Sequence, residues 1–428
     1  MRQGSHPPHL RTAAATATAL LLLLAGCGGE EQADGKDSSE PGRPSKAAPA
    51  APSAAPAAPS AAPRAHDPVT GFAAAEESLQ RDGEFALHDT TIWVAEQSGL
   101  DAYDTVTGDT SEILAETDRA VKKQPRLGAP VIARTGDRTV VLSVAPVSRP
   151  GSGTHVTTYA VVLLAADART REKLWSTEIP SEGFTQGVDL KVAGVDGDTA
   201  VVVDGWHITA VNLTTHRSVW SKPHAPDVVA VGGGTIAVAA QDEYLANQVY
   251  GLSVANGERT WTEGESASNL HVTAARPGVI LVTRGSDYGR VHATLVSLAT
   301  GRPVARTELG ATPDRCLYDE QATLVCVKDE YGYTVVAGLD AISGKKLWEL
   351  PMDDRVAPAV SAVRHGIVYG KVGDEALMLD ARTGEDRPGA LPDAPDLVNA
   401  YVGVFLDDER GRSSDYVPDA AVVRNTAG

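Results

Sequence analysis

The sequence predicts an all-β protein, a β-propeller built from four-stranded blades, and three observations support this prediction. A short motif recurs seven times along the chain at a spacing of about 43 residues, which is the length of one blade. Strand–turn–strand patterns precede the copies. Glycine (41) and proline (26) are plentiful among the 428 residues, a composition that fits many short strands and turns better than long helices.

The recurring motif, which we call the tag, joins the end of one strand to the start of the next. It begins with Asp, Asn or Ser, turns through four residues, and often carries Trp four residues after the corner of the turn. The clearest copy occupies residues 339–348 (LDAISGKKLW). The corner residues are Gly108, Arg171, His216, Gly257, Gly301, Gly344 and Gly384, and the tag tryptophans are Trp175, Trp220, Trp261 and Trp348.

Each part of the tag has a physical reason. The Asp, Asn or Ser side chain can accept a hydrogen bond from the backbone N–H two residues further on. Glycine at the corner adopts a positive φ without steric cost. Where Arg171 and His216 replace it, we expect slight strain or a different turn. The tryptophan lies on the next strand, where we expect it to pack against the neighbouring blade as a wedge.

Seven tags and one further set of strands favour eight blades over seven. The strands expected after the last tag are residues 397–400, 402–406 and 415–417. We expect an N-terminal strand around residues 71–74 to complete this final blade, because closure of the ring removes an open edge. The spacing of 63 residues between the corners at 108 and 171 predicts one longer blade with an extended hairpin at residues 145–153.

The N-terminus carries the pattern of an export signal in residues 1–26. Arg2 and Arg11 precede an apolar run at residues 13–24, and the pattern ends in Leu-Ala-Gly-Cys, with Cys27 last. The apolar run is too short to span a bilayer permanently. The pattern resembles the lipobox of bacterial lipoproteins. This resemblance implies cleavage before Cys27, its acylation by chains such as palmitate, and anchoring on the extracytoplasmic face of the cell membrane. An ordinary secretory signal with an accidental Cys27 remains the alternative.

Residues 27–68 follow as a stretch rich in Ala, Pro and Ser. They offer nothing large to bury, so we expect a solvated and partly extended tether after the lipidated Cys27. Such a tether sets the distance between the membrane and the propeller, which we expect to span residues 69–428. A merely tolerated linker is equally compatible with this composition.

Two cysteines remain, Cys316 and Cys326, which form an even pair in an exported protein. The residues between them predict a strand, a tight turn at 320–322 and a second strand. The two cysteines would then face each other across a hairpin, within disulfide range. We therefore predict a disulfide. Two free buried thiols remain the alternative, and a metal site is disfavoured because no second ligand pair stands nearby.

The pattern Asp-x-x-Ser/Thr-Gly-x-x-x-Trp of the tag resembles the repeat of the pyrroloquinoline-quinone-like propellers, from about residue 71 to the C-terminus. That superfamily includes quinoprotein dehydrogenases, the propeller lipoprotein of the outer-membrane assembly machine, and exported actinobacterial propellers with no assigned chemistry. With its lipobox and tether, the chain looks like the third kind. The resemblance implies a fold and leaves the activity open, because the repeat builds the ring and lines no site.

The sequence gives little support to a quinone cofactor. In quinoprotein dehydrogenases the cofactor lies between a tryptophan and a disulfide of adjacent cysteines, and this chain has no Cys-Cys pair. Trp93 and Trp206 lie outside the tags and could face the central funnel, although a place in the core or at the rim is favoured. We predict no cofactor.

Other catalytic and metal-binding patterns are also missing from the sequence. No His-Glu-x-x-His, Gly-x-Ser-x-Gly or Walker motif occurs. The turn at residues 196–198 lacks the remaining ligands of a calcium loop. His207, His216 and His224 fall on different strands and loops, and the acidic residues 407–409 read as a solvated loop that could bind a cation only weakly. We predict no catalytic residue and no metal ligand.

The net charge of the chain restricts the class of partner that it can bind. Lys and Arg number 38 against 56 Asp and Glu, a net charge of −18 that argues against nucleic acid. The favoured interpretation is a non-catalytic, membrane-anchored binding or scaffold module for a protein or glycan partner. The alternative is a quinoprotein-type or hydrolytic enzyme whose residues converge in the propeller funnel. Assistance in envelope-protein assembly is a third possibility, which requires a host with an outer membrane.

Overall fold

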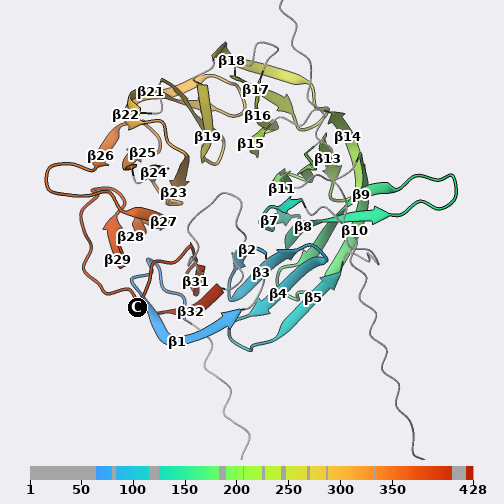
Figure 1. Cartoon of the computed structure of the whole chain (residues 1–428), viewed down its shortest axis with the longest axis horizontal. Coiled ribbons are helices and arrows are strands. Elements are labelled where there is room, and N and C mark those ends of the chain that lie inside the picture. The colour runs from blue at the N-terminus through green and yellow to red at the C-terminus, as the bar shows by residue number, and fades with distance from the viewer. Residues whose placement is uncertain are drawn as a thin grey trace, which may run out of the picture. The chain divides into compact units, whose positions relative to one another are not determined.

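Eight sheets stand around a common axis in the part of the chain that the structure describes (Figure 1). The structure is a computed structural model, and it describes residues 64–79, 83–114, 125–182, 189–205, 207–223, 227–241, 247–267, 270–285, 288–330, 333–406 and 421–427. These residues belong to one compact unit, Ser60–Gly428. The expected eight-bladed, all-β propeller is confirmed. The expectations for Cys27, Trp206, His224 and residues 407–409 and 415–417 lie outside the described residues.

Blades 1 to 4 follow one another along the chain, each running from its inner strand to its outer strand. Their strands are, for blade 1, β2 (Glu84–His88), β3 (Thr91–Glu96), β4 (Gly99–Asp104) and β5 (Thr110–Leu114); for blade 2, β7 (Val131–Thr135), β8 (Arg138–Arg149), β9 (Thr158–Asp167) and β10 (Lys173–Ser181); for blade 3, β11 (Asp189–Asp196), β12 (Thr199–Val203), β13 (His207–Asn212) and β14 (Arg217–Pro223); and for blade 4, β15 (Asp227–Gly232), β16 (Thr235–Gln241), β17 (Asn247–Ser253) and β18 (Arg259–Ala267).

Blades 5 to 8 complete the ring. Their strands are, for blade 5, β19 (Leu270–Arg276), β20 (Val279–Arg284), β21 (Tyr288–Ser297) and β22 (Pro303–Ala311); for blade 6, β23 (Arg315–Tyr318), β24 (Thr323–Glu330), β25 (Tyr333–Asp340) and β26 (Lys346–Leu350); for blade 7, β27 (Ala359–Arg364), β28 (Ile367–Val372) and β29 (Glu375–Asp380); and for blade 8, β30 (Leu397–Val398), β31 (Val402–Leu406), β32 (Ala421–Ala427) and β1 (Gly71–Leu79).

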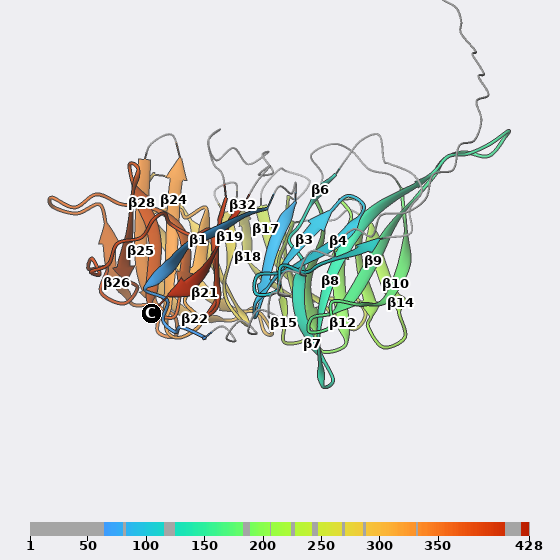
Figure 2. The ribbon, with the colours of Figure 1, turned by 90° about the horizontal axis from the view of Figure 1, so that it is seen from below.

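The antiparallel order of the strands gives the ring two different faces. Turns between the first and second strands, and between the third and fourth strands, emerge on one face, which carries every tag turn and which we call the tag face. First and third strands begin, and second and fourth strands end, at the opposite face, which we call the loop face. Figure 2 shows the ring edge-on, with the strands running between the two faces.

The ring closes where the two ends of the chain meet in blade 8. The N-terminal strand β1 pairs with the C-terminal strand β32, from Gly71 opposite Ala427 to Leu79 opposite Ala421. The ring of Phe72 meets that of Phe405 edge to face at 5.1 Å. This pairing confirms the expected N-terminal closing strand, and it leaves the inner strand β2 beside both β7 and β30.

Blade 2 carries the expected long hairpin, which projects from the ring (Figures 1 and 2). Strand β8 continues through Arg149, so residues that the sequence assigned to the loop are part of the ladder. Ala145 pairs with Val162, and Val147 pairs with Ala160. Both Ala145 and Val147 are buried, which explains why the strand persists beyond the expected boundary.

Two blades depart from four strands. In blade 7 the stretch after the tag contains Pro388, Pro392 and Pro395, and only an isolated bridge from Leu379 to Asp386 replaces the outer strand. Proline lacks the N–H that a ladder needs, which accounts for the missing strand. Blade 3 gains a short strand, β6 (Arg126–Leu127), which runs parallel to β11 at its inner edge.

Apolar side chains fill the space between successive blades. One buried cluster combines Leu142 and Leu163 of blade 2 with Leu190 and Val202 of blade 3. Cys316 and Cys326 lie opposite each other in blade 6 with their Cα atoms 4.0 Å apart, and they form the predicted disulfide. The described residues include no helix of the length and apolarity needed to cross a bilayer.

Candidate functional site

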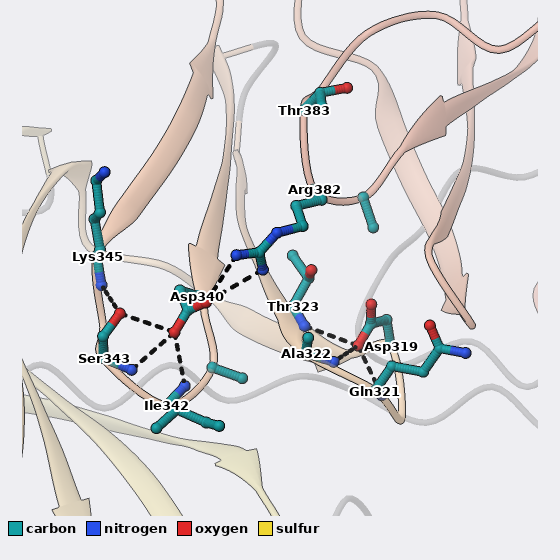
Figure 3. Close-up of polar contacts among 12 residues, drawn as sticks. Asp319, Gln321, Ala322, Thr323, Asp340, Ile342, Ser343, Lys345, Arg382 and Thr383 are labelled. Carbon is teal, nitrogen blue, oxygen red and sulfur yellow. Dashed lines mark hydrogen bonds and ion pairs between the residues drawn. The ribbon is translucent and has the colours of Figure 1, made fainter.

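The tag turns are closed by hydrogen bonds within the turn. Oδ1 of Asp340 accepts the backbone N–H groups of Ile342 (3.3 Å) and Ser343 (2.9 Å) and the Ser343 hydroxyl (2.8 Å) (Figure 3). Gly344 at the corner has φ of 70°. The same contact to the N–H two residues further on occurs at Asp104, Asp167, Asn212, Ser253 and Asp380.

The tags of blades 6 and 7 are also tied to each other. Both terminal nitrogens of the Arg382 guanidinium lie 3.2 Å from Oδ2 of Asp340 (Figure 3). The backbone N–H of Ser343, the Ser343 hydroxyl and this guanidinium lower the pKa of Asp340 to about 2. The polar groups of these turns are therefore engaged with one another.

The two corners without glycine have positive φ, 61° at Arg171 and 57° at His216. Such a conformation costs an L-residue roughly 1–2 kcal/mol. Each side chain makes a contact with the preceding blade that offsets this strain. The Arg171 guanidinium lies 2.9 Å from Asp104 of the blade 1 tag. The His216 ring stacks on Trp175, with centroids 4.3 Å apart.

Three tag tryptophans join their blade to the next one in the same way. The indole N–H donates to the backbone carbonyl three residues before the next corner. These pairs are Trp220 with Val254 (2.8 Å), Trp261 with Leu298 (2.8 Å) and Trp348 with Ala381 (2.9 Å). The next corner glycine lies against the indole. A Cβ added there would approach a ring atom to 2.9 Å at Gly257, 2.6 Å at Gly301 and 2.6 Å at Gly384. Glycine at these corners therefore has two roles: it adopts a positive φ, and its missing Cβ leaves room for the indole ring.

The contact between blades 5 and 6 is built differently, because Ala305 occupies the position of the tryptophan. The carbonyl of Ala341, which corresponds to the indole acceptors, instead accepts Nε–H of Arg276 at 2.7 Å. A Cβ added to Gly344 would lie 2.9 Å from the Ala305 methyl group, so the turn packs directly on the alanine. Sequence reasoning missed Arg276, since no local pattern links it to an acceptor 65 residues away.

A strap formed by residues 64–70 crosses blades 7 and 8 at the tag face. The His66 N–H donates to Ala400 O at 2.8 Å, and the buried Tyr369 hydroxyl donates to Val69 O at 2.6 Å. Burial raises the pKa of Tyr369 well above its usual range. His365 joins Asp67 through Nδ1 and Glu320 through Nε2. Residues 64–68 fall in the stretch assigned to the tether, and two of them contact the ring.

The loop face carries charged groups at the ends of strands. Glu84 begins β2, and its burial raises its pKa, while the nearby Arg126 of β6 acts in the opposite direction. In blade 6, the buried Lys328 lies 3.0 Å from Oδ1 of Asp314, and Oδ2 of Asp314 accepts the Asp329 N–H at 2.9 Å. Sequence reasoning assigned none of these residues to a site.

A pocket of about 300 Å³ opens between blades 4 and 5, at the loop-face ends of their strands. Its polar lining includes Asp227, Asn247 and His271, and its apolar lining includes Val229 and Val272. A second hollow, of about 370 Å³, lies between the outer strands of blades 5 and 6. Its lining mixes cations and anions: Arg290, Glu308, Lys346 and Glu349.

The described residues among those considered as cofactor or metal sites, Trp93, His207 and His216, do not come together. Trp93 is fully buried in a cluster between blades 1 and 2 and does not face the funnel. His207 lies beside Asp204 within blade 3, while His216 stacks on Trp175. Within the described ranges, no three or more His, Cys, Asp or Glu side chains are placed to hold a metal ion.

The comparisons with known proteins concern the repeat. The family model described as outer membrane protein assembly factor BamB matches residues 160–329, less than half of the chain. The match runs from β9 to β24 and supports a pyrroloquinoline-quinone-like repeat. No curated protein sequence matches significantly.

Similar solved structures have low sequence identity. BamB from Moraxella catarrhalis is 16% identical, with a TM-score of 0.48 over 82% of this chain and 98% of that chain. Quinohemoprotein alcohol dehydrogenase from Comamonas testosteroni is 12% identical, with a TM-score of 0.44 over 83% and 76%. The computationally designed Ika8 protein is 11% identical, with a TM-score of 0.37 over 74% and 98%. A shared fold does not transfer an activity.

The indole hydrogen bond between blades 6 and 7 can be tested by substitution. Trp348→Phe should lower the free energy of unfolding by about 1–3 kcal/mol, because the carbonyl of Ala381 loses its buried donor. Trp175→Phe is the matched control. Its ring can still stack on His216, so the change should stay below about 1 kcal/mol. Urea unfolding measures both, and equal effects of the two substitutions would remove the role assigned to the indole N–H.

Acid should weaken the tag turn of blade 6. Because the pKa of Asp340 falls from 3.8 to about 2 on folding, its charge stabilises the folded state above pH 3.8, and this stabilisation disappears as the pH falls toward 2. Asp340→Asn should therefore lower the urea midpoint at pH 7 and shrink the difference from the parent chain at pH 2. Asp137→Asn, in an exposed turn of blade 2, is the control. A difference independent of pH would contradict this account.

Proposed function

We propose that this chain is a lipid-anchored, extracytoplasmic β-propeller that acts as a non-catalytic binding module for a protein partner, with the loop face as its binding surface. The observation that carries the proposal is the contrast between the two faces. On the tag face, polar side chains bond within the turns and between neighbouring tags. On the loop face, strand ends present charged groups and a pocket.

The tag turns of blades 1 and 6 have little polar capacity left for a partner. Asp340 is held by Ser343 and Arg382, and Asp104 is held by its own turn and by Arg171. The strap covers a further part of this face. A partner binding there would have to break existing hydrogen bonds before forming new ones, which favours the opposite face.

The match to the assembly-factor model supports a protein as the partner class, since the described role of that family is assembly of an outer membrane protein. A glycan partner has no comparable support. The competing hypothesis is an enzyme with a quinone-dependent or hydrolytic site in the funnel, and it calls for residues from several blades to converge on one point.

The lipid anchor at Cys27 is proposed from the lipobox pattern. The strap bonds to the Ala400 turn and to His365, both of which lie at turns of the tag face.

Anchoring can be tested directly. Cys27→Ala should abolish acylation and release the chain from the membrane fraction, because a single lipidated cysteine is the proposed attachment. Mass spectrometry of the N-terminal peptide and fractionation of cells measure the two effects. Cys316→Ala is the matched control and should keep both the lipid and the location. Retention of the Cys27→Ala chain in membranes would contradict the proposed anchor.

The binding face can be located with a photoreactive amino acid placed at single positions of the full chain. Leu114, which is 49% exposed, and Val372, which is 38% exposed, lie at the loop face, whereas Ile342, which is 74% exposed, lies in a tag turn. Irradiation of cells should attach a protein partner to the first two positions and none to Ile342. Adducts at Ile342 alone would overturn the proposed face. Quinone-dependent turnover by the purified chain without any adduct would favour the enzyme.

A further inference from the structure

We infer that the pocket between blades 4 and 5 receives a cationic side chain, lysine or arginine, of the protein partner. The inference rests on the proposed function and deepens it by assigning a place and a chemistry to part of the contact. The pocket volume of about 300 Å³ is at the small end of ligand pockets, which suits one long side chain.

The pocket opens toward the side from which a partner would approach. Asp227 begins the inner strand β15, Asn247 begins β17, and His271 is the second residue of the next inner strand, β19. Inner strands start at the loop face, and third strands start there as well. Strands from two blades therefore place these three side chains around one opening.

Asp227 supplies the charge that selects a cation. Its side chain is exposed, and no cation within the described ranges lies at ion-pair distance from it. Arg284 stands opposite Leu270 in blade 5, but its guanidinium is paired with Glu263. The described residues that line the pocket include no Lys or Arg, so its acid is available to a guest.

Asn247 adds an acceptor. Its Nδ2 donates to Leu270 O at 2.9 Å, across the interface between the blades. Because a carbonyl can only accept, this bond fixes the orientation of the amide, and Oδ1 remains as the acceptor of the side chain. An ammonium or guanidinium group has donors only, so it complements both this oxygen and the Asp227 carboxylate.

The apolar lining suits the stem of such a guest. Val229, Leu270 and Val272 line the pocket together with Asp227, and the methylene groups of lysine or arginine can pack on them. An acidic guest would meet the Asp227 charge, and a purely apolar guest would desolvate that carboxylate without compensation. Both are therefore disfavoured.

The hollow between blades 5 and 6 differs from the pocket in that an acid of its lining is already paired. There Lys346 lies 3.2 Å from Glu349, and Glu349 also accepts the Gly310 N–H at 2.9 Å. Lys346 and Glu349 of that hollow therefore compensate each other, whereas the Asp227 charge is not compensated by a described cation. The pocket differs in the same way from the tag face, where Asp340 is paired with Arg382 and Asp104 with Arg171.

Nuclear magnetic resonance of the methyl-labelled full chain in detergent tests the inference with small probes. Acetyl-arginine amide and acetyl-lysine amide should shift the methyl signals of Val229, Leu270 and Val272. Acetyl-norleucine amide and acetyl-glutamate amide should not. Asp227→Asn should weaken binding of the basic probes about fivefold, while Asp137→Asn, an exposed acid of the tag face, should leave it unchanged.

The methyl signals of the other blades show whether each variant is folded. Ala240→Leu, which narrows the pocket without changing charge, should also weaken the basic probes. Equal shifts with the norleucine probe, no shifts with any probe, or unchanged binding in a folded Asp227→Asn chain would each overturn the inference.

The inference and the proposed function can fail separately. If photoreactive Leu114 and Val372 capture a partner whose attachment is indifferent to Asp227→Asn, the pocket assignment is wrong and the binding face stands. If the basic probes bind at Val229 while partners attach only through Ile342, the pocket assignment stands and the proposed face is wrong.

Discussion

The contact between a tag corner and the outer strand of the preceding blade is the constraint on which the ring depends. A glycine corner lets the turn approach closely, and an indole from the preceding blade fills the space and donates to the carbonyl beside the turn. Burial of the ring and satisfaction of a backbone acceptor occur together, so one residue contributes both packing and a hydrogen bond. This contact joins blade 3 to blade 4, blade 4 to blade 5 and blade 6 to blade 7.

Other residues can replace the tryptophan or the glycine when they supply the packing or the hydrogen bond in another way. At Ala305 the turn packs directly on a methyl group, and the Arg276 guanidinium supplies the donor that the indole supplies elsewhere. At Arg171 and His216 a side chain occupies the strained corner and compensates through an ion pair or through stacking. The shared feature is a contact between each of these corners and the preceding blade, and tryptophan with glycine is one way to build it.

Local patterns predicted most of the fold, and distant contacts account for what they missed. Tag spacing indicated eight blades, and the hairpin between Cys316 and Cys326 indicated the disulfide, because periodicity and pairing within a hairpin are readable over short stretches. Three prolines after the last tag would have indicated the missing strand of blade 7. No short pattern could join His365 to Asp67, or Asp227 to Asn247 and His271, since these groups meet only when different strands or chain ends are brought together.

The two faces of the ring differ in how regularly their turns are built. Most tag turns use the side chain of their first residue, Asp, Asn or Ser, to accept backbone N–H groups of the same turn. The loop face has no corresponding rule, because its turns and connections vary in length without disturbing the contact between corner and outer strand. An acidic chain with a net charge of −18 attracts basic partners in general. In the proposed contact, the Asp227 carboxylate, which is paired with no described cation, and the apolar lining of the pocket convert that general attraction into a located one, because only a guest with both a stem and a cationic head satisfies the two parts at once.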